Sequence, residues 1–385
     1  MKNRIYLDYA ATTPVDPEVL EVMTAALREN YGNASSIHAS GRTAHRALDQ
    51  ARRQVAASVG ASPEEIFFTS GGSESNNWAL KGIAMSLREK GRHVITGAIE
   101  HHSVLHTCDW LEKQGFEISR LPVDACGRIS PESVLGAIRP DTILISIMMA
   151  NNEIGTLEPV TEIGQIARGK GILFHTDAVQ AFGAIPIDTG KSPLDLMSLS
   201  AHKIYGPKGV GALYVRKGVR PEALVHGGAQ ERGRRAGTEN TAGIVGFGKA
   251  AEIAAARMEA DSSRIRELRD LLIRGILTEI PGSRLNGDPV RRLPNNASFS
   301  FEDIDGEALL LRLDLIGIEG SAGSACTSGS LDPSHVLKAI GLSREQALGS
   351  LRLTLGRETG ENDIQEVIRR IAPIVTDLRA MRTVS

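Results

Sequence analysis

Lys203 and Asp177 are two side chains whose surroundings favour chemistry. Lys203 follows an apolar run at residues 195–200, and Asp177 closes another at residues 172–176. A lysine at the mouth of a low-dielectric site loses affinity for its proton and can form a Schiff base. An unpaired carboxylate at a strand end is unfavourable, so we expect Asp177 to have a cationic partner. Taken singly, a surface lysine and a helix N-cap explain these two residues more simply.

Two further segments follow apolar runs. SGGSESNN, at residues 70–77, precedes a predicted helix, and its exposed backbone N–H groups and Ser73 suit a phosphate; a plain glycine-rich turn is the alternative. IEHHSVL, at residues 99–105, offers His101 or His102 as a base or a ring-stacking group, unless the pair is simply solvated. Together, a phosphate cradle, a carboxylate, a stacking histidine and a lysine are what a pyridoxal phosphate site requires.

One further segment contains a cysteine. SAGSACTSGS, at residues 321–330, has no bulky residue, so Cys326 has no core to join there. A thiol in such a loop suits a nucleophile that must travel. Cys108 lies in a helical pattern and Cys126 in a turn-like DACGR sequence, so both are predicted to be structural.

The elements that must position these groups alternate between short apolar runs and helical periods. This alternation predicts an α/β fold in which a mainly parallel sheet is flanked by helices. A different pattern follows residue 260, with helices at residues 262–278 and from 362, and a strand at 294–301. We therefore predict a large domain over residues 15–260. Residues 1–14 and 261–385 would form a smaller α+β domain that carries the cysteine loop, at about 320–333.

Composition excludes several classes of protein. Lys plus Arg number 44 and Asp plus Glu 46, giving a net charge of −2, so no basic field exists to hold nucleic acid. No apolar run is long enough to span a membrane, and the N-terminus lacks the apolar stretch of a signal peptide. Three cysteines argue against a disulfide framework. We expect a cytoplasmic globular protein.

Six stretches of the chain resemble the cysteine desulfurases, in the class V aminotransferase family with the fold-type I pyridoxal phosphate architecture. The resemblance runs from near the N-terminus to the last helix. GSACTS looks like the long-loop cysteine motif of the subgroup that serves iron–sulfur assembly, and ERGRRAGTEN and TSGSLDPSHV look most like its nitrogen-fixation branch. Ser73 and Asn76 stand where this family usually has Thr and Asp. The matching stretches are YLDYAATTP, GNASSIH, HTDAVQ, SAHKIYGPKG, ERGRRAGTEN and GSACTSGSLDPSHVL.

The resemblance implies a role for each matching residue. Lys203 would hold the cofactor covalently, Asp177 would pair with its ring nitrogen, and His101 would stack on its ring and deprotonate Cys326, the nucleophile. Arg352 would bind the substrate carboxylate. The remaining implied contacts are Gly72, Ser73, Ser200 and His202 to the phosphate, Gln180 and Asn152 to the cofactor O3′ region, Asn152 also to the substrate, and Thr238 to the phosphate of the other subunit.

The resemblance also implies the reaction and its partners. Sulfur would leave L-cysteine, giving L-alanine and a persulfide on Cys326, which a homodimeric enzyme would pass to an iron–sulfur scaffold or another acceptor. Contact with iron would be transient, through that persulfide alone. A transaminase, a selenocysteine lyase and a non-catalytic docking scaffold are the alternatives, although a transaminase has no use for a mobile thiol.

Overall fold

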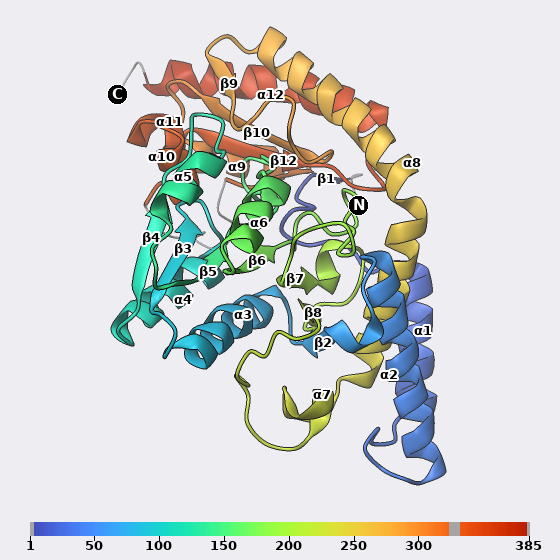
Figure 1. The fold of residues 1–385 in the computed structure, drawn as a ribbon. Coiled ribbons are helices and arrows are strands. Elements are labelled where there is room, and N and C mark those ends of the chain that lie inside the picture. The colour runs from blue at the N-terminus through green and yellow to red at the C-terminus, as the bar shows by residue number, and fades with distance from the viewer. Residues whose placement is uncertain (1–3, 323–331, 383–385) are drawn as a thin grey trace.

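The computed structural model describes residues 4–322 and 332–382 and contains a seven-stranded sheet in the order β2-β8-β7-β6-β5-β3-β4 (Figure 1). The five strands from β7 to β4 are mutually parallel, as predicted. β8 runs antiparallel to both β2 and β7, so the apolar run at residues 211–215 is a buried strand but not a parallel one. The strands are β2 (Ile66–Thr69), β3 (His93–Gly97), β4 (Glu117–Leu121), β5 (Thr142–Ser146), β6 (Leu173–Asp177), β7 (Leu196–Ser200) and β8 (Gly211–Val215).

Helices cover both faces of this sheet because its central strands are apolar on both sides. Val94 and Leu144 pack with Trp78 beneath α3 (Gly72–Leu87) and α4 (His102–Lys113). Their neighbours Ile95 and Ile145 join the opposite core, to which α1 (Pro17–Glu29), α2 (Ala39–Ser58), α6 (Val160–Gly169) and the first half of α8 (Thr241–Glu279) contribute. The predicted α/β class with a mainly parallel sheet is confirmed.

A second, three-stranded antiparallel sheet has its own apolar core. Its strands, in the order β12-β10-β9, are β12 (Ser350–Thr354), β10 (Asn296–Phe301) and β9 (Ser283–Leu285). The second half of α8 packs there with α9 (Gly306–Leu315) and α12 (Glu361–Arg382). α8 runs unbroken through residue 260 (Figure 1). Its first half contributes residues to one apolar core and its second half to the other. The division of the chain near that residue stays a prediction.

The N-terminal segment returns to the end of the chain. β1 (Ile5–Tyr6) pairs in parallel with β11 (Ile318–Glu319), and Asp8 forms a bridge with Thr354 of β12. This pairing carries the segment just after β1 across the carboxyl edge of the large sheet, where it reaches the site described below.

No helix among residues 4–322 and 332–382 is long and apolar enough to cross a membrane.

The remaining elements are short. The short elements are η1 (Pro63–Glu65), η2 (Ala201–Lys203), α5 (Pro131–Ala137), α7 (Gln230–Gly233), α10 (His335–Ala339) and α11 (Arg344–Leu348).

Candidate active site

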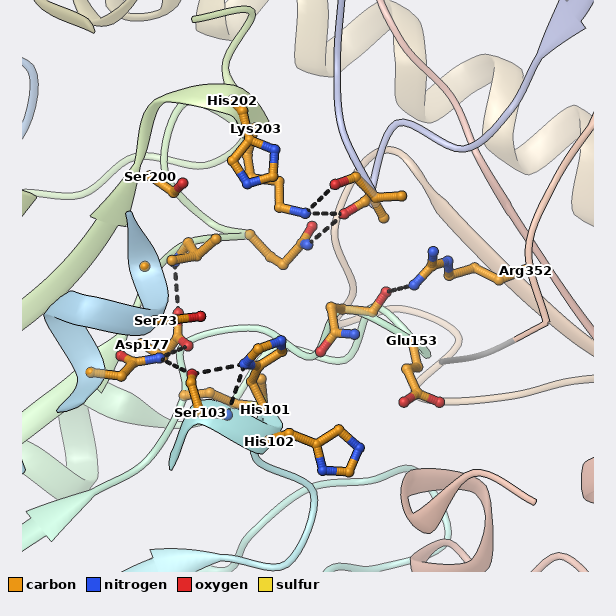
Figure 2. Close-up of a pocket in the computed structure, with 18 of the residues that line it drawn as sticks. Ser73, His101, His102, Ser103, Glu153, Asp177, Ser200, His202, Lys203 and Arg352 are labelled. Atoms are coloured by element: carbon orange, nitrogen blue, oxygen red, sulfur yellow. Dashed lines mark hydrogen bonds between the residues drawn. The ribbon is translucent and has the colours of Figure 1, made fainter. Parts of the chain in front are cut away.

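A cavity of about 310 Å³ lies at the carboxyl ends of β3, β5, β6 and β7, where open α/β sheets bind their ligands. Most of the residues selected from the sequence line it (Figure 2). Those brought together are Gly72, Ser73, His101, Asn152, Asp177, Gln180, Ser200, His202, Lys203 and Arg352.

Lys203 lies at the end of η2, directly after β7, and its amine turns toward the N-terminal segment. Nζ donates to the carbonyl oxygens of Ala10 and Ala11, at 2.6 Å in each case. Gln180 donates to the same Ala10 oxygen at 2.9 Å. These neutral acceptors orient the amine at the cavity wall, where an incoming carbonyl carbon could reach it.

Asp177 ends β6 with its carboxylate buried at the cavity floor. Oδ1 accepts from the backbone N–H of Val179 at 2.9 Å, and Oδ2 accepts from Nδ2 of Asn76 at 2.6 Å. Both donors are neutral, so neither supplies the cation expected from the sequence. A protonated ring nitrogen in the cavity would supply that charge.

The start of α3 and the end of β7 form a cradle for an anion. A Cβ atom on Gly72 would lie 2.7 Å from Cγ2 of Val179, so the helix can begin this close only with glycine. Oγ of Ser200 is buried with no hydrogen-bond partner among the described residues. A phosphate at the N-terminus of α3 would give that hydroxyl an acceptor, so these residues fit the group.

His202 stands beside this cradle as a neutral ring. Burial, with smaller contributions from Lys203 and Lys208, lowers its pKa to about 4. Nδ1 lies 3.2 Å from the hydroxyl of Thr12. A neutral ring here can donate a hydrogen bond to an anion without adding charge.

His101 lies immediately before α4 and accepts from the backbone N–H of Ser103 as the cap of that helix. The adjacent His102 lies 4.7 Å from His335 and 5.0 Å from His106, measured between ring centroids. Burial is the main cause that lowers the pKa values of His102 and His335. These lowered pKa values favour the neutral forms of His102 and His335 at neutral pH.

Arg352, on β12, brings a buried guanidinium to the cavity from the second sheet. Nη1 donates to the carbonyl oxygen of Asn152 at 3.0 Å, and Nη2 donates to Oδ1 of Asp8 at 2.9 Å. A guanidinium oriented in this way suits the planar carboxylate of an amino acid.

The sequence analysis did not single out several residues at this site. Asp8 orients Arg352, and the carbonyls of Ala10 and Ala11 orient Lys203; all three lie in the matching stretch YLDYAATTP, a signal that could have found them. Glu153, which follows Asn152, is buried in the cavity wall, and its Oε2 accepts from Ser334 at 2.5 Å. Burial is the main cause that raises the pKa of Glu153.

Two of the selected residues are absent from that list. Cys326 lies outside the described residues. Thr238 is exposed and lines a separate cavity of about 160 Å³, next to Glu239. Of the other cysteines, Cys108 is buried in α4, where burial raises its pKa to about 12, as suits a structural residue, and Cys126 is partly buried.

Comparison with known proteins identifies the class that this fold and site define. The Aminotransferase class-V profile matches residues 5–367, so the chain belongs to that family. The family is pyridoxal-phosphate-dependent, and the cradle, Asp177 and Lys203 fit that cofactor.

Curated relatives and solved structures cover nearly the whole chain. A protein named cysteine desulfurase IscS from Methanosarcina thermophila is 56% identical over 98% of this chain and 93% of its own length. One of the same name from Dictyoglomus turgidum is 53% identical over 99% of this chain and 97% of its own. A structure titled NifS-like protein has a TM-score of 0.92 at 40% identity, covering 98% of this chain and all of its own. A NifS-like protein from Rickettsia africae gives 0.88 at 32%, covering 97% of this chain and 100% of its own.

Proposed function

We propose that the protein is a cysteine desulfurase, which takes sulfur from L-cysteine and leaves L-alanine. The observation that carries the proposal is the convergence of Lys203, Asp177 and Arg352 on one cavity. The cysteine desulfurase relatives at more than 50% identity support the same activity. Bound pyridoxal phosphate supplies an electron sink for the substrate α-carbon.

Each residue of the chain has a defined task in this proposal. Arg352 binds the substrate carboxylate with its paired N–H groups, and Asn152 lies beside it. With the cofactor bound, Lys203 would hold its aldehyde, and Nζ of Lys203 would take the proton from the substrate α-carbon. Asp177 would keep the ring nitrogen protonated, and His101 would stack on the ring.

Sulfur transfer is assigned to Cys326. Its thiolate attacks the substrate sulfur, so an S–S bond forms while the substrate C–S bond breaks and its electron pair returns to the carbon side. Protonation of the carbon that carried the sulfur, and return of the α-proton from Lys203, complete alanine. The persulfide then passes to an acceptor, for which an iron–sulfur scaffold is the proposed partner, with iron touched only through that persulfide.

We also propose a cytoplasmic homodimer. Thr238 supports this assembly because it is exposed and lies away from the cavity of its own chain. From there it could reach the phosphate site of a second copy.

The test is incubation of the purified protein with L-cysteine and a thiol, with alanine and sulfide quantified beside the visible spectrum. Equal amounts of alanine and sulfide, with no need for a keto acid, are expected. A keto-acid requirement would contradict the proposal and favour a transaminase. Cys326→Ala should retain the cofactor absorbance but release no sulfide, and full activity in that variant would remove Cys326 from its role.

A further inference from the structure

A chain of hydrogen bonds at the floor of the cavity joins Asp177 to His101. Nδ2 of Asn76, on α3, lies 2.6 Å from Oδ2 of Asp177 and 2.8 Å from Oγ of Ser103, on α4. That hydroxyl lies 2.7 Å from Nδ1 of His101 (Figure 2). Asn76 is buried, and the other three residues line the same cavity.

The chemistry of the groups fixes which atom donates in each of these hydrogen bonds. An ionised carboxylate only accepts, so the amide atom that faces Asp177 must be the nitrogen of Asn76. Its second hydrogen points to Oγ of Ser103, which therefore accepts there. The Ser103 hydroxyl is left to donate its own hydrogen to Nδ1 of His101.

A second donor reaches the same ring nitrogen. His101 is the N-cap of α4, and the backbone N–H of Ser103 donates to Nδ1 at 3.1 Å. Both interactions require a lone pair on Nδ1. In a neutral imidazole the proton must then be on Nε2.

We infer that Asn76 and Ser103 are positioning residues that hold His101 as the Nε2–H tautomer, so that this ring meets the reactants as a hydrogen-bond donor. The position of the proton follows from the geometry, whereas its use in catalysis rests on the proposed function. A neutral ring in this state has no lone pair on Nε2. To take the proton of Cys326 there, as expected from the sequence, His101 would have to adopt the other tautomer and lose both donors to Nδ1, so that proton goes to another base.

Imidazole nitrogen NMR on the full-length protein labelled with ¹⁵N-histidine tests the tautomer directly, with and without pyridoxal phosphate. His101→Asn identifies the signal to be assigned among those of the ten histidines. We expect a protonated Nε2 and an unprotonated Nδ1 at neutral pH. A protonated Nδ1, or averaging between the two tautomers, would overturn the inference, and this readout does not depend on desulfurase activity.

Two variants of Ser103 and one control variant test whether the Ser103 side chain sets the tautomer of His101. Ser103→Ala leaves only the backbone donor, so the His101 signal should broaden or shift toward mixed tautomers, and Ser103→Thr should restore it. With one hydrogen bond to the ring lost, kcat for cysteine should fall about three- to tenfold with little change in KM. Ser86→Ala, on α3 away from the cavity, is the matched control and should change neither. An unchanged His101 signal and kcat in Ser103→Ala would remove Ser103 from its role.

Asn76→Ala should affect both Asp177 and His101, the two ends of the hydrogen-bond chain. It frees the Ser103 hydroxyl to rotate, so the tautomer signal should change as in Ser103→Ala. It also removes the hydrogen bond that Asn76 donates to the Asp177 carboxylate, so the affinity for pyridoxal phosphate should fall about tenfold. If the cofactor affinity falls but the His101 signal is unchanged, Asn76 supports Asp177 alone and the coupling to His101 is wrong.

Discussion

The two sides of the cavity are built in different ways. On one side, Ser200, Asp177 and Lys203 lie at or just beyond the ends of neighbouring strands of the large sheet. On the other side, Arg352 comes from the second sheet and is held by Asp8, which is 344 residues away along the chain. The first side depends on one rigid scaffold, whereas the second requires two distant parts of the chain to meet.

This difference separates cofactor binding from substrate binding. The groups that fit pyridoxal phosphate belong almost entirely to the sheet edge, and the guanidinium that fits the substrate carboxylate belongs to the other side. Changes to the sheet edge should therefore affect the bound cofactor. Changes to the opposite side should affect KM while the cofactor stays in place.

The largest effect is expected for Lys203→Ala. Without the amine, no covalent link to the cofactor aldehyde can form, so desulfurase activity should fall to background and the absorbance of the lysine-bound cofactor should disappear. Lys191 is a highly exposed lysine between β6 and β7, so Lys191→Ala is the control and should behave as wild type. An unchanged spectrum in Lys203→Ala would refute the assignment.

Arg352→Lys tests the opposite side. A lysine keeps the charge but loses the planar pair of donors, so KM for cysteine should rise about 100-fold, with the cofactor spectrum unchanged. Arg369→Lys, on the exposed face of α12, should leave KM unchanged. Loss of the cofactor in Arg352→Lys would show that the two sides are not separable.

Acid should weaken the large sheet through His175, which is fully buried on β6 between the hydroxyls of Ser146 and Ser198. Burial lowers its pKa from 6.5 to about 3. The unfolded chain therefore binds a proton below pH 6.5 that the folded chain does not. The free energy of unfolding should decrease as the pH falls through this range, by up to about 1.4 kcal/mol per pH unit.

Denaturant titrations of wild type and His175→Gln at pH 7 and pH 5 isolate this contribution from those of other groups. The wild type should lose about 2 kcal/mol more than the variant over those two pH units. Equal losses in the two proteins would show that His175 does not titrate in this way. Among the described residues after residue 260, no histidine is fully buried, so no matching loss is expected from the second apolar core.

The smallest effect is expected for Ser200→Ala. Its hydroxyl has no partner among the described residues, so the cofactor-free protein should be as stable as wild type or slightly more so. Affinity for pyridoxal phosphate should fall about three- to tenfold, because one hydrogen bond to the phosphate is lost. Ser198→Ala on the same strand should instead reduce stability, since that hydroxyl is bonded to His175. Unchanged cofactor affinity in Ser200→Ala would remove this hydroxyl from the phosphate cradle.

The sequence predicted the position of a site residue best where that residue directly follows an apolar run. Ser200, Asp177 and His101 lie at or near the ends of apolar runs, and parallel strands bring such ends to one edge. It could not predict that β8 is antiparallel, because a strand that is apolar on both faces does not indicate its direction. Asn76 and Ser103 were also missed as partners, since a hydrogen bond between two helices leaves no periodic signal.

The pairing of β1 with β11, and of Asp8 with Arg352, has a consequence for biosynthesis. Residues 5–8 leave the ribosome long before their partners, because β11 is complete only at residue 319 and the partner of Asp8 is residue 352. At about 5–20 residues per second, the 344-residue separation corresponds to a wait of roughly 20 to 70 seconds. The large sheet can assemble during that interval, but a nascent chain could not bind its amino-acid substrate through Arg352 until that residue has been made.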